Sequence, residues 1–277
     1  MKNNILEINN LKVFPNNNSR LKLVKNISLS LKKGKTTCIV GESGSGKSLT
    51  ALSVMQLLSS QLSMSGNIVF EGINLLNLTK EEMRKKRGKD IAMIFQEPMT
   101  SLNPVLTIGY QIEEAVGVHE NLIKTELNKR VEELLNIVGI PTDRINSYPD
   151  ELSGGQRQRV MIAMAISCSP KLLIADEPTT ALDVTVQAQI LNLLNDLKLK
   201  FQMTMLFITH DFGVVDDIAD DVAVMYQGEI VEQGKVLNVL KNPKHPYTKA
   251  LLGCVPDPQG KKDLKPIDYS ALKRAMG

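Results

Sequence analysis

The sequence predicts an α/β fold, in the form of one large domain with a helical insertion, and three observations carry this prediction. The β-rich run TTCIV, residues 36–40, leads through a glycine-rich loop into a segment with helical periodicity. The apolar run LLIA, residues 172–175, is too short for a helix and indicates a buried strand. Between about residues 97 and 151, apolar residues recur at spacings of three and four, which is typical of helices. A chain of 277 residues with 43% hydrophobic content has ample core for this architecture.

The individual elements follow in order along the chain. Alternation in MKNNILEINN predicts a first strand, and β-rich segments extend to about residue 40. Residues 49–58 predict the first helix, GNIVFEGINLL (66–76) a hairpin, and IAMIFQ (91–96) a further strand. The basic run RKKRGK (84–89) lies beside Glu81 and Glu82 and is predicted to be the solvated face of a polar helix. In the helical insertion, Gly139 is predicted to lie near a helix C-cap.

The glycine-rich loop GESGSGKS, residues 41–48, fits the phosphate-binding pattern GxxxxGK[ST] at every fixed position. Its glycines let backbone N–H groups approach anionic oxygens, and the following helix N-terminus favours anions. We expect Lys47 to open this helix and its ammonium to reach the β/γ-phosphates, and the Ser48 hydroxyl to ligate Mg²⁺. A chance glycine-rich turn is the alternative, which the strand–loop–helix context disfavours. The predicted nucleotide-binding residues are Gly41, Glu42, Ser43, Gly44, Ser45, Gly46, Lys47, Ser48 and Leu49.

Two further predicted strands end in residues suited to hydrolysis. The strand at 172–175 is followed by Asp176, which we expect to hold Mg²⁺ through water, and by Glu177. Glu177 is predicted to polarise the water that attacks the γ-phosphate, with a second metal-shell carboxylate as the alternative. LFITH (206–210) predicts a strand ending in His210, at the sheet edge where α/β proteins bind ligands. Its position favours contact with the γ-phosphate over a purely structural histidine.

A third motif, LSGGQ, occupies residues 152–156 and precedes the basic helical segment QRQRVMIAMAI. Ser153, Gly154 and Gly155 come before a helix predicted to begin at about Gln156, so the motif forms a second anion-binding helix N-terminus. A flexible glycine turn is the alternative, but it does not explain the motif's place before a basic helix and an Asp–Glu strand.

These three motifs, in this order, resemble the nucleotide-binding subunit of ABC transporters over residues 5–255. The resemblance implies an ABC-type nucleotide-binding domain with a mixed-sheet RecA-like core, an antiparallel β subdomain, a helical subdomain at about 97–155 and a short tail at 256–277. It makes Gln96 the Q-loop glutamine, which senses ATP, contacts the metal and takes part in catalysis. It also places Asp183, with Ala181 and Leu182, in the D-loop, and Phe14 where an aromatic ring stacks on adenine. A core side chain is the alternative for Phe14.

The resemblance also implies partners, because ABC cassettes pack head to tail and the LSGGQ of one closes on ATP held by the other. The chain carries one copy of each motif, so we expect a second ABC ATPase subunit, by default a paralogue that forms a heterodimer. Two transmembrane permease subunits and an extracellular substrate-binding protein complete the implied assembly, with ATP and Mg²⁺ as cofactors. No segment approaches the roughly 20 apolar residues of a membrane helix. We therefore expect a peripheral protein on the cytoplasmic face of the cell membrane.

Two stretches narrow the subfamily. QEPMTSLNPVLTIGYQIEE (96–114) and NPKHPYTKALLGCVPD (242–257) resemble cassettes that drive import of oligopeptides, dipeptides and nickel. Peptide import is favoured, and a nickel or metallophore importer is the alternative. Many peptide members continue into a cysteine-bearing tail that in some binds an iron–sulfur cluster. The C-terminal part of this sequence contains only Cys254, so we expect no cluster.

Other classes of function explain the sequence less well. ABC ATPases that act on DNA or ribosomes usually bring coiled coils, zinc modules or fused cassettes, none of which the sequence contains. The formal net charge of +3, from 33 basic and 30 acidic residues, is too balanced to indicate a nucleic-acid partner. A kinase or GTPase with a phosphate loop leaves LSGGQ and His210 unexplained.

Overall fold

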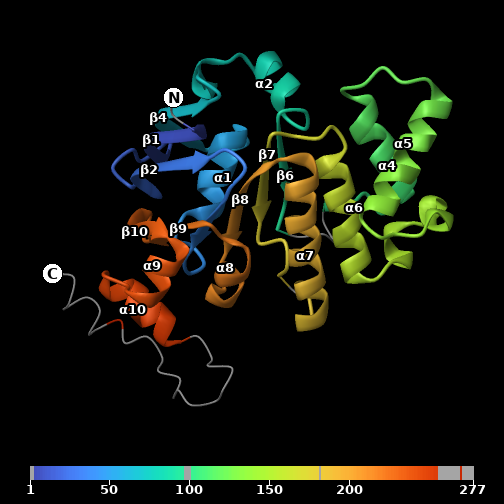
Figure 1. Cartoon of the computed structure of the whole chain (residues 1–277). Helices are drawn as coiled ribbons and strands as arrows, with labels where there is room; N and C mark the ends of the chain where they lie inside the picture. Colours follow the sequence, from blue (N-terminus) through green and yellow to red (C-terminus); the bar gives the residue numbers. More distant parts are fainter. Residues whose placement is uncertain (1–2, 97–100, 181, 255–268, 270–277) are drawn as a thin grey trace. The chain divides into compact units, whose positions relative to one another are not determined.

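The computed structural model describes residues 3–96, 101–180, 182–254 and 269. The chain forms two compact units: residues 1–76 with 207–277, and residues 77–206 (Figure 1). Strand β8 (Thr204–Thr209) begins in the second unit and ends in the first. Helices and strands alternate along the chain, which confirms the predicted α/β class. The first unit contains β1 (Asn4–Pro15), β2 (Val24–Lys32), β3 (Thr36–Val40), α1 (Lys47–Met55), β4 (Leu62–Phe70), β5 (Ile73–Asn74), α8 (Phe212–Ile218), β9 (Asp221–Tyr226), β10 (Glu229–Lys235), α9 (Val236–Lys241) and α10 (Pro246–Gly253).

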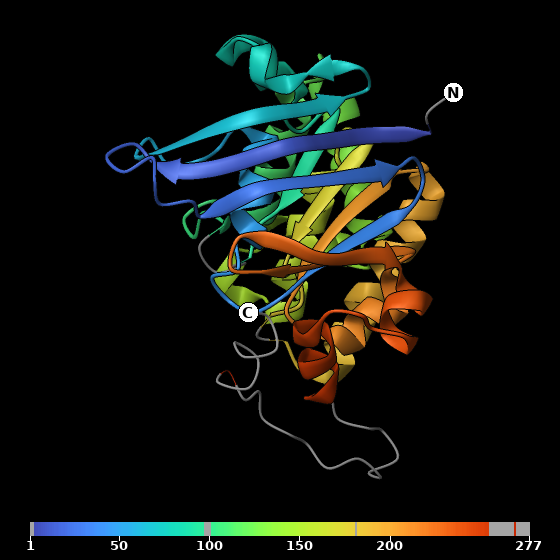
Figure 2. The same cartoon turned by 90° about the vertical axis from the view of Figure 1, so that its left-hand side faces the viewer.

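The first unit contains a four-stranded antiparallel sheet in the order β2-β1-β4-β5 (Figure 2). Strand β1 pairs with β2 through Glu7↔Ser30 and with β4 through Glu7↔Val69. The alternating burial along β1 shifts phase at Asn10, which has a φ of +53° and lies at a break in the register with both neighbours. A Cβ on Gly66 would lie 2.6 Å from the carbonyl oxygen of Asn10, so only glycine fits there. The predicted β-rich N-terminal part and the hairpin at 66–76 are confirmed.

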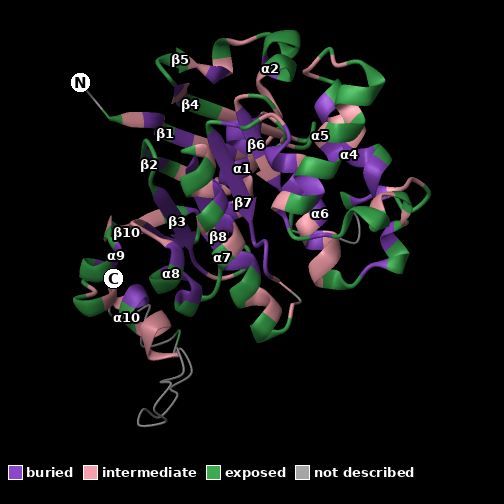
Figure 3. Ribbon diagram, turned by 45° about the vertical axis from the view of Figure 1, so that its right-hand side comes forward, coloured by how far each residue is buried: buried purple, intermediate pink, exposed green. Residues whose placement is uncertain are grey.

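A second group of strands in the same unit supports the phosphate loop. Strand β3 pairs in parallel with β9, and β9 pairs antiparallel with β10. All five residues of β3 are buried, as Figure 3 shows and as the TTCIV run predicts. The chain leaves β3 at Val40 and enters the glycine-rich loop directly, so this buried strand fixes where the loop begins.

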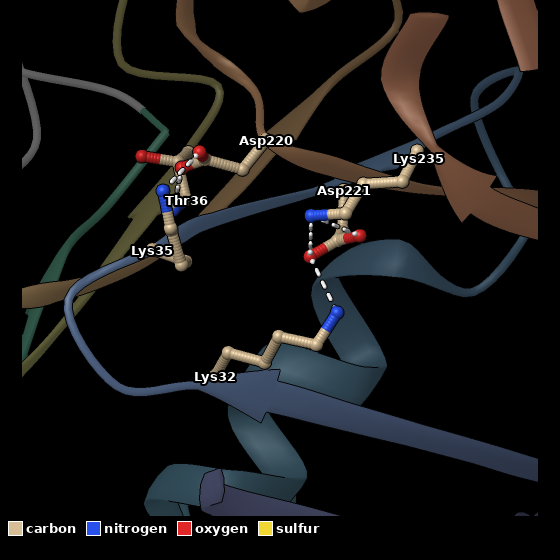
Figure 4. A network of polar contacts seen from close by, with 6 residues as sticks. All are labelled: Lys32, Lys35, Thr36, Asp220, Asp221 and Lys235. Atoms are coloured by element: carbon tan, nitrogen blue, oxygen red, sulfur yellow. Dashed lines mark hydrogen bonds and ion pairs between the residues drawn. The ribbon is translucent and has the colours of Figure 1, made fainter. Parts of the chain in front are cut away.

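Ion pairs join the start of β3 to the start of β9 (Figure 4). The carboxylate of Asp220 accepts hydrogen bonds from the Thr36 N–H and the Lys35 ammonium, each at 2.9 Å. The hydrogen bond to Asp220, and then the charge of that carboxylate, raise the pKa of Lys35 above its ordinary value. Asp221 pairs with Lys32 at 3.3 Å and with Lys235 at 3.2 Å. The lysines are exposed, so each pair contributes little to stability. The Asp221 pairs connect the start of β9 to the ends of β2 and β10.

The second unit combines a parallel strand pair with helices. Strand β6 pairs in parallel with β7, residue by residue from Ile91↔Leu172 to Ile94↔Ala175. The insertion contains two helices with amphipathic sequences, α4 and α5, which confirms the helical periodicity. Gly139, with a φ of +73°, directly follows the C-cap residue Val138, as predicted. The unit contains α2 (Lys80–Lys86), β6 (Ile91–Ile94), α4 (Ile108–Gly117), α5 (Lys124–Ile137), α6 (Gly154–Ile166), β7 (Leu172–Asp176), α7 (Val184–Phe201) and short 3₁₀ turns at Thr142–Asn146 and Pro149–Glu151.

Some predicted features lie outside the described residues. These are residues 97–100 at the start of the predicted helical subdomain, Ala181 of the predicted D-loop, and the predicted tail at 256–277 apart from Tyr269. The predicted domain boundaries therefore stay predictions. Among the residues that are described, no helix is both long and apolar enough to cross a membrane.

Candidate functional site

The phosphate loop is closely packed against the end of β9. A Cβ on Gly41 would lie 2.1 Å from the carbonyl oxygen of Met225, and one on Gly46 would lie 2.8 Å from its side-chain Cε. Gly46 is also the N-cap of α1 with a φ of +106°, and Gly44 has a φ of +78°. The glycines are therefore required by backbone conformation at two positions and by close packing at two. Helix α1 begins at Lys47, as predicted, so the N–H groups of its first turn face the loop.

Lys47 is held on the inner side of this loop. Its side chain is only 4% exposed, and its ammonium donates to the carbonyl oxygens of Gly41 and Glu42 at 2.8 and 2.9 Å. A buried ammonium needs such acceptors, because burying an unpaired charge costs roughly several kcal/mol. The loop and the lysine therefore form one hydrogen-bonded unit.

The residues of the loop fit a bound phosphate. Ser45 is buried, and its hydroxyl has no hydrogen-bond partner among the described residues. An unpaired buried hydroxyl is costly, and a phosphate oxygen is the kind of group that would satisfy it. An open hollow of about 290 Å³ lies over the loop and is lined in part by Glu42, Ser43, Gly44 and Ser45. Ser48 and Leu49, the other predicted contacts, lie half-buried in the first turn of α1.

In the second unit, Glu177 is held by two side chains. Strand β7 ends at Asp176, which is 4% exposed, and the next residue, Glu177, is 8% exposed with a φ of +47°. One oxygen of the Glu177 carboxylate accepts hydrogen bonds from the Gln96 amide and from the Thr180 hydroxyl, both at 3.1 Å. The predicted Q-loop glutamine and the predicted hydrolytic carboxylate are thus in direct contact. Sequence reasoning missed Thr180, which lies one turn after Glu177.

The donor set of this unit fits a hard cation. Asp176, Glu177 and Gln96 offer carboxylate and amide oxygens, the ligand type that Mg²⁺ prefers. In the first unit, Ser48 offers a hydroxyl of the same hard character. A buried aspartate at the end of a strand is costly unless it is hydrogen-bonded or faces a positive charge. The predicted metal-binding residues therefore carry the oxygen donors that Mg²⁺ prefers.

The LSGGQ motif forms a capped helix N-terminus. Helix α6 begins at Gly154, and Ser153 is its N-cap. The Ser153 hydroxyl accepts from the Gln156 N–H at 3.3 Å, and the Gln156 side chain accepts from the Ser153 N–H at 3.0 Å. This reciprocal capping box occupies two of the groups that sequence reasoning assigned to an anion. Ser153 and Gly154 are exposed, so the helix end is accessible.

The second glycine of the motif has a packing reason inside the chain. A Cβ on Gly155 would lie 2.6 Å from a methyl of Val186 in α7. Asp183, the predicted D-loop aspartate, caps α7 by accepting from the Val186 N–H at 2.9 Å. Val186 thus lies between the LSGGQ helix and the D-loop cap. Within this unit, the LSGGQ motif and the D-loop aspartate therefore both contact Val186.

The remaining predicted residues are both accessible. His210 directly follows β8, as predicted, and is exposed. Phe14 lies one residue before the end of β1 and is only partly buried, so it does not belong to the hydrophobic core. The Lys22 ammonium lies 3.9 Å from the centroid of its ring, a cation–π contact on that ring.

Comparison with known proteins gives two family matches. Residues 24–180 match the family described as ABC transporter, and residues 231–275 match the family described as the C-terminal region of oligopeptide/dipeptide transporters. The first match covers the phosphate loop, LSGGQ and Glu177, and the second covers α10. The phosphate loop, LSGGQ and Glu177 therefore fall inside the first matched segment, whereas Phe14, Asp183 and His210 lie outside both.

Individual relatives agree with these matches. The chain is 49% identical to the oligopeptide transport ATP-binding protein OppD of Bacillus subtilis (strain 168), over 95% of this chain and 75% of the relative. It is 50% identical to the glutathione import ATP-binding protein GsiA of Escherichia coli (strain K12), over 96% of this chain and 44% of that protein. Among solved structures, the dimeric ATP-binding cassette MJ0796 bound to ADP and Pi is 29% identical, with a TM-score of 0.74 over 83% of this chain and 98% of that one.

Proposed function

The chain belongs to the ABC transporter family, and from this premise we propose that it couples ATP hydrolysis to the import of peptides as the ATPase subunit of a membrane importer. It is an ABC-type ATPase with the fold of that family's cassettes. The observation that carries the substrate class is the match of residues 231–275 to the C-terminal region of oligopeptide/dipeptide transporters. The relatives named for oligopeptide and glutathione transport support it, since glutathione is itself a short peptide. A nickel importer has no such support here.

On this proposal ATP binds first through its phosphates. The N–H groups of the phosphate loop and of the first turn of α1 donate hydrogen bonds to phosphate oxygens, and the Ser45 hydroxyl gains a hydrogen-bond partner. The Lys47 ammonium shifts from the Gly41 and Glu42 carbonyls to the β/γ-phosphates. Phe14 stacks on the adenine. Ser48, Asp176 and Gln96 would hold Mg²⁺, which would supply positive charge to the phosphate oxygens.

Hydrolysis then depends on orienting one water molecule. We assign Glu177 as the group that accepts a hydrogen bond from the attacking water and polarises it, and His210 as a contact to the γ-phosphate. The Gln96 amide donates to this carboxylate, and we assign Gln96 as the residue that senses ATP. Catalysis of this kind comes from positioning and electrostatics rather than from covalent chemistry.

The complete catalytic unit on this proposal is a dimer of cassettes. Ser153, Gly154, Gly155 and Gln156 of one cassette close on ATP held by the phosphate loop of the other, and Asp183 lies at the same junction. A closed dimer that binds ATP better than the open one converts binding energy into a conformational change. We propose a paralogous second cassette, two permease subunits and an extracellular binding protein, with this chain peripheral on the cytoplasmic face and no nucleic-acid partner.

The test is ATPase activity of the chain reconstituted in lipid with candidate permeases and the second cassette. Each reaction is run with an empty binding protein, a peptide-loaded one and a nickel-loaded one. Stimulation by the peptide-loaded protein supports the proposal. Stimulation only by the nickel-loaded protein assigns the cargo to metal, and activity that responds only to added nucleic acid rejects the transport role.

Thr180→Ala is expected to slow hydrolysis without weakening ATP binding. The substitution removes one of two side-chain donors to the Glu177 carboxylate, a hydrogen bond that contributes about 1 kcal/mol. We expect kcat to fall roughly fivefold and the KM for ATP to stay unchanged. Steady-state kinetics of the reconstituted complex checks this, and Thr180→Ser, which keeps the hydroxyl, is the matched control. A rise in KM with constant kcat contradicts the assignment.

A further inference from the structure

The sequence His245-Pro246-Tyr247 forms the start of α10, within the segment that matches the oligopeptide/dipeptide transporter C-terminal region. His245 is the N-cap, and its ring nitrogen Nδ1 accepts from the Tyr247 N–H at 3.2 Å. Pro246 is the first helical residue, where its missing N–H costs nothing. The three residues together fix the point and direction at which α10 begins.

A carboxylate on β10 anchors this helix start. The two oxygens of Glu232 accept the N–H groups of Lys244 at 2.8 Å and His245 at 2.9 Å. The residues just before α10 are therefore attached to the β9–β10 hairpin. Because these residues are anchored, the position of Tyr247 in the first turn of α10 is fixed as well.

Tyr247 contacts the beginning of the phosphate loop. Tyr247 is completely buried, and its ring packs against Tyr226 with centroids 4.2 Å apart. Its hydroxyl accepts the N–H of Glu42, the second residue of the loop, at 3.1 Å. Burial raises the pKa of Tyr247, so the group is a neutral phenol at physiological pH.

The Glu42 residue connects this phenol to Lys47. The N–H of Glu42 is held by Tyr247, and the carbonyl of the same residue accepts from the Lys47 ammonium. A second phenol from the C-terminal region, Tyr269, donates to the Glu42 carboxylate at 2.5 Å. A change in the position of Glu42 therefore changes the position of the lysine that we assign to the phosphates. None of these three hydrogen bonds involves a backbone N–H group of the first turn of α1.

We propose that Tyr247 is a positioning residue for ATP: through the Glu42 N–H its hydroxyl holds the phosphate loop in the conformation that binds nucleotide, so that ATP affinity depends on the seating of α10. This inference rests on the proposed function, because it assumes that the loop binds ATP. It gives the C-terminal region a role at the nucleotide site. In that role Tyr247 sets the geometry of a loop residue that lies 205 positions earlier in the chain.

The test compares Tyr247→Phe with Tyr226→Phe in the full chain. The first variant keeps the ring contact and removes only the hydroxyl that accepts from Glu42, while the second removes a hydroxyl that accepts only from the Gln227 side chain among the contacts described. We expect Tyr247→Phe to weaken MgATP binding roughly three- to tenfold, the range of one lost hydrogen bond. The KM for ATP rises by the same factor with kcat little changed, and Tyr226→Phe stays at the wild-type value. Calorimetry and steady-state kinetics measure both quantities.

Hydrogen exchange separates positioning from general destabilisation. The Glu42 amide is expected to exchange faster in Tyr247→Phe, with other amides of the first unit unaffected. A variant that binds MgATP like the wild type overturns the inference, as does one that melts at lower temperature with unchanged affinity. If wild-type chain itself fails to bind MgATP, the proposed function fails instead, so the two failures are distinguishable.

Discussion

Glu177→Gln is expected to abolish turnover while ATP binding stays intact. The side chain is 8% exposed, and its carboxylate is aligned by Gln96 and Thr180, each 3.1 Å away. Glutamine keeps the size and an oxygen that can accept both hydrogen bonds, but it is a far weaker acceptor for the proton of an attacking water. Removal of a general base costs roughly 10²- to 10⁴-fold, and we expect a loss of kcat in this range. Single-turnover hydrolysis of radiolabelled ATP measures it.

The control for this variant is another glutamate of the same unit. Glu113 in α4 pairs with Lys124 at 2.6 Å and has no assigned role in hydrolysis. Glu113→Gln should hydrolyse ATP at the wild-type rate, because it loses only a surface ion pair. If dimers form on ATP binding, Glu177→Gln should also prolong them, which size-exclusion chromatography detects. Normal turnover in Glu177→Gln removes the residue from its catalytic role and favours the alternative of a carboxylate near the metal.

The sequence alone predicts the buried strands well. The runs TTCIV and LLIA contain only residues that favour burial, and both strands are buried over their full length. The start of α1 at Lys47 was predicted correctly, whereas α6 was predicted to begin two residues late, at about Gln156 instead of Gly154. Glycine has a low helix propensity, so Gly154 and Gly155 were not predicted to be part of α6. The Ser153…Gln156 spacing is a capping-box pattern, and that signal identifies the true start of α6.

Contacts within the candidate site were less predictable, because they depend on tertiary structure. Glu177 has a left-handed φ, which glutamate rarely adopts and which its sequence does not indicate. The alternation of side chains along β7 therefore does not extend to Glu177 and cannot predict the direction of its side chain. Its hydrogen bond to Gln96 joins residues that are 81 positions apart. The contact between Tyr247 and Glu42 spans 205 positions. Periodicity reports on neighbours along the chain and carries no information at such separations.

Lys47→Ala is expected to eliminate most of the affinity for ATP. The ammonium is buried at the base of the phosphate loop, where it donates hydrogen bonds to two oxygens, the carbonyls of Gly41 and Glu42. A charge-assisted hydrogen bond contributes roughly 1.5–3 kcal/mol, so we expect MgATP affinity to fall by about two orders of magnitude. Isothermal calorimetry measures the affinity, and thermal unfolding without nucleotide reports whether the loss of the loop contacts also lowers stability.

A matched lysine shows whether the charge itself or its position is responsible. Lys35→Ala removes the same charge six residues before the loop, but from an exposed ion pair with Asp220. Because such pairs contribute little, this variant should bind MgATP like the wild type. Equal losses in both variants would mean that the overall positive charge of the unit attracts ATP, and retention of full affinity in Lys47→Ala would count against the phosphate loop as the nucleotide site. Loss in Lys47→Ala alone assigns phosphate binding to the one ammonium that the loop encloses.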